Sequence, residues 1–452
     1  MINTEKTSSL LKKALALSDA DQTEVLFWAN DSHLTRFANN CIHQNVSEKN
    51  RSLSIRVVLG KKIGSASTNL LDPESIKNTV AKGLQIAHNQ KDNPHFRSLP
   101  PAGGKYASVD TFDAETASFT PDQRAQIARK VIEIAKRNHL IASGALSTGT
   151  IQVAVANSLG IQVCQSFTRG ALKIVFQTPD GASGYADSFS ARMSEIDPEQ
   201  MAHQAAEKCA KGTHPADLPP GQYPVVLEPY AVGDMVGFLA YLGFGALAMQ
   251  EGRSFMCGRL GQRITGENIT IWDDGTSACG MPLPFDFEGV PKQPVTLIEN
   301  GVARGVVYDS YTAGREEGKT STGHALPAPN TFGPVPLNLF MKSGDSNLQE
   351  MIESTERGIY VTRFHYTNPL EPVKAVITGM TRDGTFLIED GQIKNGVRNL
   401  RFTQSILEAF SRVSMISRDT RLVPGLEEEL GGTVVPALKI EKFNFTGATA
   451  AV

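Results

Sequence analysis

The chain has 452 residues, of which 40% are hydrophobic and 20% are charged, which is enough for roughly two or three domains with ordinary cores. Its formal net charge is −3 at pH 7, and its Lys and Arg residues form no basic stripe, which argues against direct binding of nucleic acid. The scattered cysteines and the absence of a long apolar window or a leader peptide exclude a disulfide framework, a zinc knuckle and a membrane span, so we expect a cytoplasmic protein.

The N-terminal part alternates helices and strands. A helix is expected over residues 7–17, followed by four short strands within 24–67 and by a helix that begins after Asp72-Pro73, a favourable N-cap and N1 pair. Residues 93–105 are rich in Pro and Gly, which is typical of a linker or a long surface loop.

A second group of elements follows this loop. Thr120-Pro121-Asp122-Gln123 predicts a helix that starts with a capping box. Four short strands are expected within 141–177, then a helix up to Lys211. The proline-rich stretch 213–221 is the best domain boundary. We therefore predict an α+β fold, with an N-terminal α/β region (1–220, with a possible subdivision near 93–120) that combines an antiparallel sheet and helices, followed by a β-rich C-terminal domain (221–452).

The C-terminal domain opens with an apolar segment, residues 230–250, that predicts one buried helix. Its apolar residues recur at helical spacing: Val232, Met235, Val236, Leu239, Leu242 and Ala246. Four glycines interrupt it, each costing helix propensity of about 1 kcal/mol relative to alanine. Close approach of another backbone would explain their presence.

The segment 284–326 combines an acidic turn, a hairpin and a polar loop. Asp286 and Glu288 precede a glycine, and strands are expected over 295–298 and 306–308, joined across Glu299-Asn300-Gly301. A polar loop, Ser321-Thr-Gly-His-Ala325, follows. Further on, Arg382-Asp383-Gly384 is typical of a hairpin turn between strands.

In this order, these motifs resemble the TldD/PmbA peptidase family, whose members are also labelled modulators of DNA gyrase. The resemblance extends through Glu251–Phe255, Thr378–Phe386 and Leu387–Gly391, and it covers the chain from Gly221 onward. It implies dimers around a cavity, in which a TldE subunit pairs with a metal-bearing TldD partner that cuts unfolded peptides. The TldD type binds its metal through an H-E-x-x-x-H helix and a late cysteine.

The matching positions in this chain are Gly237, Phe238 and Leu242. Neither glycine nor leucine offers the imidazole, thiolate or carboxylate that zinc requires, and residues 412–452 contain no cysteine. The chain therefore resembles the TldE/PmbA type, which lacks the metal motif. No cofactor is expected in it, and zinc or a similar metal is expected only in a TldD-type partner.

Other polar groups have competing interpretations. Asp286 with Glu288 could form an acid/base pair, but at such a turn these carboxylates more often accept hydrogen bonds from backbone amides. His324 could form a catalytic dyad with Ser321 or Thr322, although the sequence places no third orienting group. We predict substrate binding for Ser321, Thr322, His324 and Asn330, and no catalytic residue in this chain.

The leading functional hypothesis is a metal-free TldE/PmbA-like subunit of a peptidase that acts on unfolded peptides in proteolysis or peptide maturation. Such a chain would be inactive alone and would bind substrate in a dimer cavity. Its partner would be a TldD-type paralogue or a second copy of itself. The alternative is a stand-alone homodimer that binds a peptide or small ligand without catalysis. An autonomous hydrolase that uses Ser321 or His324 is a third hypothesis.

Overall fold

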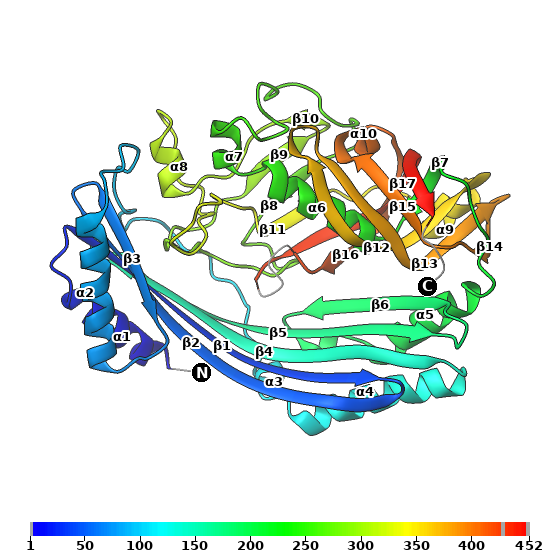
Figure 1. The fold of residues 1–452 in the computed structure, drawn as a ribbon, viewed down its shortest axis with the longest axis horizontal. Helices are drawn as coiled ribbons and strands as arrows, with labels where there is room; N and C mark the ends of the chain where they lie inside the picture. The colour runs from blue at the N-terminus through cyan, green and yellow to red at the C-terminus, as the bar shows by residue number, and fades with distance from the viewer. Residues whose placement is uncertain (1–2, 426–429, 449–452) are drawn as a thin grey trace.

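The computed structural model describes residues 3–425 and 430–448. The N-terminal half forms a six-stranded antiparallel sheet in the order β3-β2-β1-β4-β5-β6. The strands are β1 (Gln22–Ala38), β2 (Cys41–Leu59), β3 (Lys62–Thr68), β4 (Ile141–Asn157), β5 (Gln162–Gln177) and β6 (Ser183–Ser190). Long, curved strands therefore replace several of the short ones expected from the sequence (Figure 1). Strand β1 continues through polar residues such as Asp31, which pairs with Thr150 of the neighbouring strand β4.

Helices cover one face of this sheet. They are α1 (Thr4–Ala16), α2 (Pro73–Asn89), α3 (Ala114–Ala117), α4 (Pro121–Arg137) and α5 (Pro198–Lys211), with a 3₁₀ turn, η1 (Met193–Glu195). Asp72 caps α2, and Thr120 with Gln123 forms the expected capping box of α4. The period of two in β1 directs Val25 and Phe27 toward the helices. Their neighbours along the strand point to the opposite face.

That opposite face packs against the C-terminal half, which lies over the curved sheet in Figure 1. Leu26 and Trp28 of β1 belong to a core cluster that also contains Phe285 and Phe287 from the acidic turn. The rings of Trp28 and Phe287 stack with centroids 5.8 Å apart. The two halves are thus joined by apolar packing, and not only by the chain that links them.

The C-terminal half is built around an 11-stranded mixed sheet. Its strands are β7 (Gly221–Leu227), β8 (Ile271–Asp273), β9 (Val295–Glu299), β10 (Val302–Ala303), β11 (Asn338–Met341), β12 (Arg357–Glu371), β13 (Val376–Glu389), β14 (Gln392–Gly396), β15 (Leu400–Ser405), β16 (Val413–Val423) and β17 (Gly432–Ala448). Its helices are α6 (Pro229–Gly243), α7 (Ala246–Gln250), α8 (Ser310–Gly314), α9 (Leu348–Glu353) and α10 (Ile406–Phe410), with the 3₁₀ turn η2 (Pro372–Lys374). The predicted α+β fold class is confirmed.

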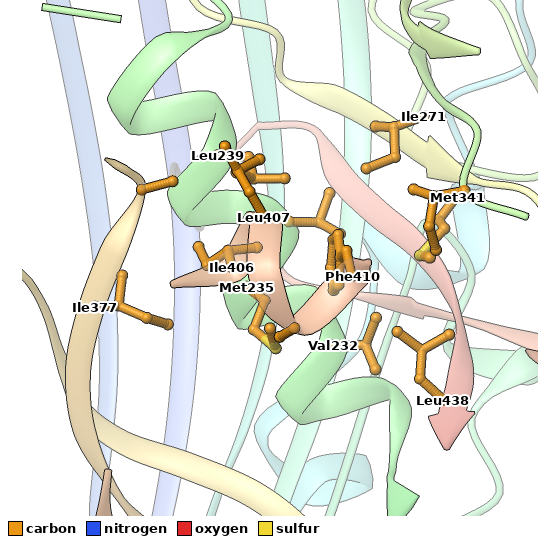
Figure 2. Packing of buried hydrophobic residues seen from close by; sticks show 14 of the residues in the cluster. Val232, Met235, Leu239, Ile271, Met341, Ile377, Ile406, Leu407, Phe410 and Leu438 are labelled. Atoms are coloured by element: carbon orange, nitrogen blue, oxygen red, sulfur yellow. The ribbon is translucent and has the colours of Figure 1, made fainter. Parts of the chain in front are cut away.

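Helix α6 supplies the centre of the largest core cluster. Val232, Met235 and Leu239, spaced three and four residues apart, point toward α10, β13 and β17, where Figure 2 shows the facing side chains. Phe410 of α10 and Leu438 of β17 are fully buried in the same cluster. This apolar stripe fixes the orientation of α6 and turns its other face toward the N-terminal sheet.

The prediction of one helix over residues 230–250 is wrong, because α6 ends at Gly243 and α7 begins at Ala246. Between them the chain is extended at Gly245, with φ −92° and ψ 140°. A distant segment supplies the hydrogen bonds there. The amide of Val307 donates to the carbonyl of Phe244, and the amide of Ala246 donates to the carbonyl of Val307. A side chain at Gly245 would place its Cβ 2.3 Å from the carbonyl oxygen of Pro334.

The hairpin after β9 forms at the expected turn but with a different second strand. Asn300 and Gly301 have φ 48° and 79°, which suits a tight turn of this kind. The partner strand is Val302–Ala303, and not residues 306–308. Val307 instead forms an isolated bridge with Gly245.

The predicted hairpin turn at Arg382-Asp383-Gly384 is also wrong. Strand β13 runs without interruption through these residues, paired with β12. Asp383 has φ 52° inside the strand, and the register with β12 shifts nearby, between Val361 and Arg363. The sequence signal for a turn therefore marks an irregularity within a strand pair.

In the part of the chain that the structure describes, no helix is both long enough and apolar enough to cross a membrane.

Candidate functional site

A cavity of about 160 Å³ lies where α6, β6, β12 and the end of β16 meet. We call it the α6 cavity. The residues that line it are Tyr185, Asp187, Tyr230, Gly233, Asp234, Gly237, Arg363, Phe364, Val423, Pro424, Gly425 and Thr433. Its walls thus come from both halves of the molecule.

The helix contributes one polar face. Tyr230, Gly233, Asp234 and Gly237 line the cavity together because residues three and four apart lie on the same side of a helix. This face is opposite to the apolar stripe of Figure 2. The two glycines project no side chain, which leaves space beside the carboxyl group of Asp234.

Asp234 is held by one hydroxyl group. The Oγ1 of Thr367 donates to its Oδ2 over 2.5 Å. Burial raises the pKa of Asp234, while Thr367 and the more distant charge of Arg363 lower it less. Among the described residues, Asp234 forms no salt bridge.

On the β12 side, Arg363 faces the cavity while it pairs with Asp383 of β13. Its Nε donates to Asp383 Oδ2 over 2.9 Å, and its Nη2 donates to the same oxygen. The hydroxyl of Ser183 in β6 donates to the other oxygen of Asp383 over 2.7 Å. The guanidinium carbon of Arg363 also lies 4.5 Å from the centroid of the Tyr185 ring, a distance suited to a cation–π contact.

Strand β6 is tied to the C-terminal half around Asp187. The hydroxyl of Tyr230 accepts from the amide of Asp187 and donates to its carbonyl, both over 3.0 Å. Arg421 of β16 donates to the same carbonyl over 2.6 Å and covers the Tyr230 ring at 4.8 Å. The hydroxyl of Tyr185 donates to the carboxylate of Asp187 over 2.8 Å. These bonds fix the walls of the cavity.

A second, larger cavity of about 500 Å³ lies beyond Asp383, between the β5–β6 turn and β13. Arg363 lines the α6 cavity and Asp383 lines the second one. The ion pair between them therefore forms part of the partition between two polar spaces at the junction of the two halves.

The three positions predicted to match the family's metal motif do not lie together. Gly237 is in the cavity wall, Phe238 packs partly buried against the main core, and Leu242 is 3% exposed inside that core. Residues five apart on a helix point about 140° away from each other. These side chains carry no donor atoms, so they do not fit a metal ion. Across residues 3–425 and 430–448, no group of three His, Cys, Asp or Glu side chains is placed to hold one.

The polar loop forms a buried chain of hydrogen bonds. Thr322 Oγ1 lies 2.9 Å from His324 Nδ1, and His324 Nε2 lies 2.8 Å from Asp273 Oδ1. Asp273 is thus the third group that the sequence did not place. The side chains of His324 and Asp273 are fully buried, and burial lowers the pKa of the histidine. These hydrogen bonds hold the polar loop against β8.

The remaining predicted residues make local contacts. Ser321 accepts from the amide of Gly323 over 3.2 Å, and Asn330 accepts from the amide of Phe332 over 2.8 Å. Neither they nor Thr322 and His324 are among the described residues that line the α6 cavity. Their role in substrate binding stays a prediction.

The acidic turn binds backbone amides, and that interpretation is confirmed. Asp286 accepts from the amides of Glu288, Val290 and Ala325, each over 2.9 Å. Glu288 accepts from the amide of Ser310 over 3.0 Å and from Arg56 of β2 over 2.9 Å. The turn is therefore a structural link between the halves.

Two family models match this chain. One, described as the PmbA/TldA metallopeptidase C-terminal domain, matches residues 220–447, and one described as domain 1 of the same metallopeptidases matches residues 24–87. The chain belongs to the PmbA/TldD metallopeptidase family.

Individual relatives are distant, and some of them cover most of the chain. The metalloprotease PmbA of Escherichia coli O157:H7 is 24% identical, over 96% of this chain and 95% of its own length. A metalloprotease of Methanothermobacter thermautotrophicus is 26% identical over 84% of each chain. The crystal structure of TldE from Thermococcus kodakarensis superposes with a TM-score of 0.88 at 21% identity, covering 98% of this chain and all of that one. This last likeness shows a shared fold.

Sequence reasoning missed the residues that give the cavity its charge. Arg363 and Asp383 meet only because β12 and β13 pair, which the expected turn at Asp383 concealed. Asp234, however, left a signal. It is the only charged residue in the apolar segment 230–250, and a lone charge in a buried helix is costly unless it has a partner or a ligand.

Proposed function

We propose that this chain is a TldE-like, metal-free subunit of a TldD/TldE-type peptidase, and that it binds unfolded peptide while a partner cleaves it. The observation that carries the proposal is the set of residues that helix α6 presents. In the matching helix of the TldD type we expect metal ligands and a catalytic glutamate, whereas this helix offers Gly237 and Phe238. Amide hydrolysis by a metallopeptidase needs a polarised carbonyl and an activated water, which these residues cannot supply.

A subunit without metal can still accelerate the reaction of its partner. Holding a substrate extended and close to the partner's metal lowers the entropic cost of reaching the transition state. The α6 cavity and the second cavity supply polar walls for such holding. Ser321, Thr322, His324 and Asn330 are further proposed substrate contacts, and the cytoplasm is the proposed compartment.

A reconstitution experiment tests the proposal. The isolated chain is expected to leave an unfolded peptide intact, and its mixture with a TldD-type paralogue is expected to cleave that peptide in a chelator-sensitive way. The matched control is the paralogue alone, since a subunit role requires that the pair cleave faster. Chelator-insensitive cleavage by the isolated chain would refute the proposal and favour an autonomous hydrolase.

The same preparation tests the assembly. Light scattering is expected to show a dimer, of this chain with the paralogue or with itself. A chain that remains a homodimer, ignores the paralogue and still binds peptide would support the alternative, a stand-alone binding protein. Elemental analysis of the dialysed chain is expected to find no stoichiometric zinc, and about one zinc per chain would show that the positions at Gly237 and Leu242 are misassigned.

A further inference from the structure

The charges around the α6 cavity are unevenly matched. Arg363 uses two of its donor groups on Asp383 and lies over Tyr185, and Arg421 donates to the backbone of Asp187 while covering Tyr230. Both arginines therefore have partners other than Asp234. Within the described residues, no Lys, Arg or His forms an ion pair with the Asp234 carboxylate.

Asp234 also has unused hydrogen-bonding capacity. Thr367 donates one hydrogen bond to it, whereas a carboxylate offers about four acceptor sites. The remaining sites face the cavity, which is also lined by aromatic residues and glycines. Its other charged residues already have partners: Arg363 pairs with Asp383, and Asp187 accepts from the hydroxyl of Tyr185. A group that enters this space therefore meets one carboxylate, that of Asp234, that no cation among the described residues pairs with.

Size and chemistry narrow the group that fits. A cavity of about 160 Å³ is comparable to one that holds a benzene-sized molecule, so it accepts a chain end or one side chain but no folded segment. Calcium and magnesium prefer about six or more oxygen ligands, which one carboxylate does not supply. An ammonium group carries one positive charge and three donors, which match a single carboxylate with free acceptor sites.

We propose that the α6 cavity binds the primary ammonium group of a peptide, with Asp234 as its counter-ion. Two sources share this chemistry, the α-amino terminus and the ε-amino group of a lysine. The inference rests on the proposed peptide-binding function and adds to it the group that is recognised. Binding of this group would hold the amine-bearing part of the peptide beside the cavity face of α6.

The test uses the full isolated chain and isothermal titration with three short peptides. They are Gly-Ala-Gly amide, its N-acetylated form, and N-acetyl-Gly-Lys-Gly amide. We expect at least one of the two amine-bearing peptides to bind at least about tenfold more tightly than the acetylated peptide that has no amine. Which of the two binds identifies the source of the ammonium group.

The variant Asp234→Asn keeps the size of the side chain and removes its charge, so it is expected to abolish the preference for the amine. Asp345→Asn, at an exposed position, is the matched control and should preserve it. Equal binding of all three peptides by the unmodified chain would overturn the proposal, as would a preference for the amine that survives Asp234→Asn. The comparison of the three peptides on the unmodified chain tests the proposal even if the variant does not fold.

The ammonium site and the proposed subunit role can be refuted independently of each other. Peptide cleavage by the reconstituted pair with no preference for the amine would refute the ammonium site alone. A preference for the amine without any effect on a partner's cleavage would refute the subunit role alone.

Discussion

The buried groups Asp273, Lys292 and His324 show how one charge sets the ionisation of its neighbours. Burial on its own would raise the pKa of Asp273, but Lys292 and His324 hold it below its usual range. Burial and the charge of Lys292 both lower the pKa of His324. The arrangement therefore favours an ionised Asp273 and a neutral His324 whose Nε2 donates to the carboxylate.

A pH dependence of stability follows for His324. Because its pKa is lower in the folded chain, stability that is present above pH ~6.5 is lost as the pH falls below that value. His324→Gln, which can still donate to Asp273, should lose less stability than the unmodified chain between pH 7 and about pH 5. Urea unfolding at both values measures this, and an equal loss in both proteins would contradict it.

Asp286 titrates in the opposite sense. Burial and the nearby Glu288 raise its pKa to about 8, so its contribution to stability is present at low pH and is lost as the pH rises toward 8. Both His324→Gln and the unmodified chain contain Asp286, so its contribution cancels when their losses of stability are compared. The pH profile of one protein alone would mix the two contributions.

At the scale of elements, α6 depends on small residues where β16 approaches it. A Cβ at Gly233 would lie 2.4 Å from Cγ2 of Val423. A side chain cannot pack at so short a distance, so the Val423 side chain, the helix or the strand must move when the glycine is replaced. Glycine at position 233 costs helix propensity, but it permits a close contact between α6 and β16 that a larger residue would disturb.

Gly233→Ala is expected to lower the free energy of unfolding by about 1–3 kcal/mol, the usual range for overpacking, although alanine is the better helix former. Gly447→Ala is the matched control, because a Cβ there meets nothing within 4 Å. Chemical denaturation of both variants provides the measurement. A stabilised Gly233→Ala variant would show that β16 yields at little cost.

Some elements could be predicted because their signals are local. Asp72 and Thr120 mark helix starts by capping the helices that follow them, and Asn300-Gly301 marks a turn by its own backbone preference. The end of α6 could not be predicted in this way. It depends on Val307 and Pro334, which are far along the chain, so no nearby residue announces it.

The same reasoning explains the error at Asp383. Arg-Asp-Gly has the composition of a turn, but Arg363 and Ser183 bind the carboxylate of Asp383 and the pairing with β12 continues past it. The α6 cavity was missed for a related reason, since its walls come from segments between residues 185 and 433. Only Asp234 could have indicated it from the sequence.

At the scale of the molecule, the two halves are joined by a buried ion-pair cluster. Arg56 of β2 binds Glu24 of β1 over 2.6 Å and Glu288 of the acidic turn over 2.9 Å. Its side chain is 14% exposed, and those of the two glutamates are 4% and 5% exposed. One cation thus compensates two carboxylates from different halves. The division of the chain at residues 220 and 221, with a subdivision near 93–120, stays a prediction.

Arg56→Met should destabilise the chain by about 3–5 kcal/mol, because it leaves two buried carboxylates without a cation. Adding Glu24→Gln and Glu288→Gln to this variant should recover part of the loss. Arg357→Met is the control, since its pair with Glu389 is exposed and such pairs contribute at most about 1 kcal/mol. Thermal and urea unfolding measure the series, and similar effects of Arg56→Met and Arg357→Met would contradict the buried role.

Strand β17 has a consequence for the synthesis of the protein. It pairs with β7, β11, β15 and β16, although it comes after all of them in the chain. While the ribosome still holds residues 432–448, these four strands lack a neighbour and expose unpaired edges, which are sites of aggregation. The N-terminal sheet, whose strands end at residue 190, can form much earlier during synthesis. A nascent chain would therefore spend part of its synthesis with one half folded and the other in need of protection by chaperones.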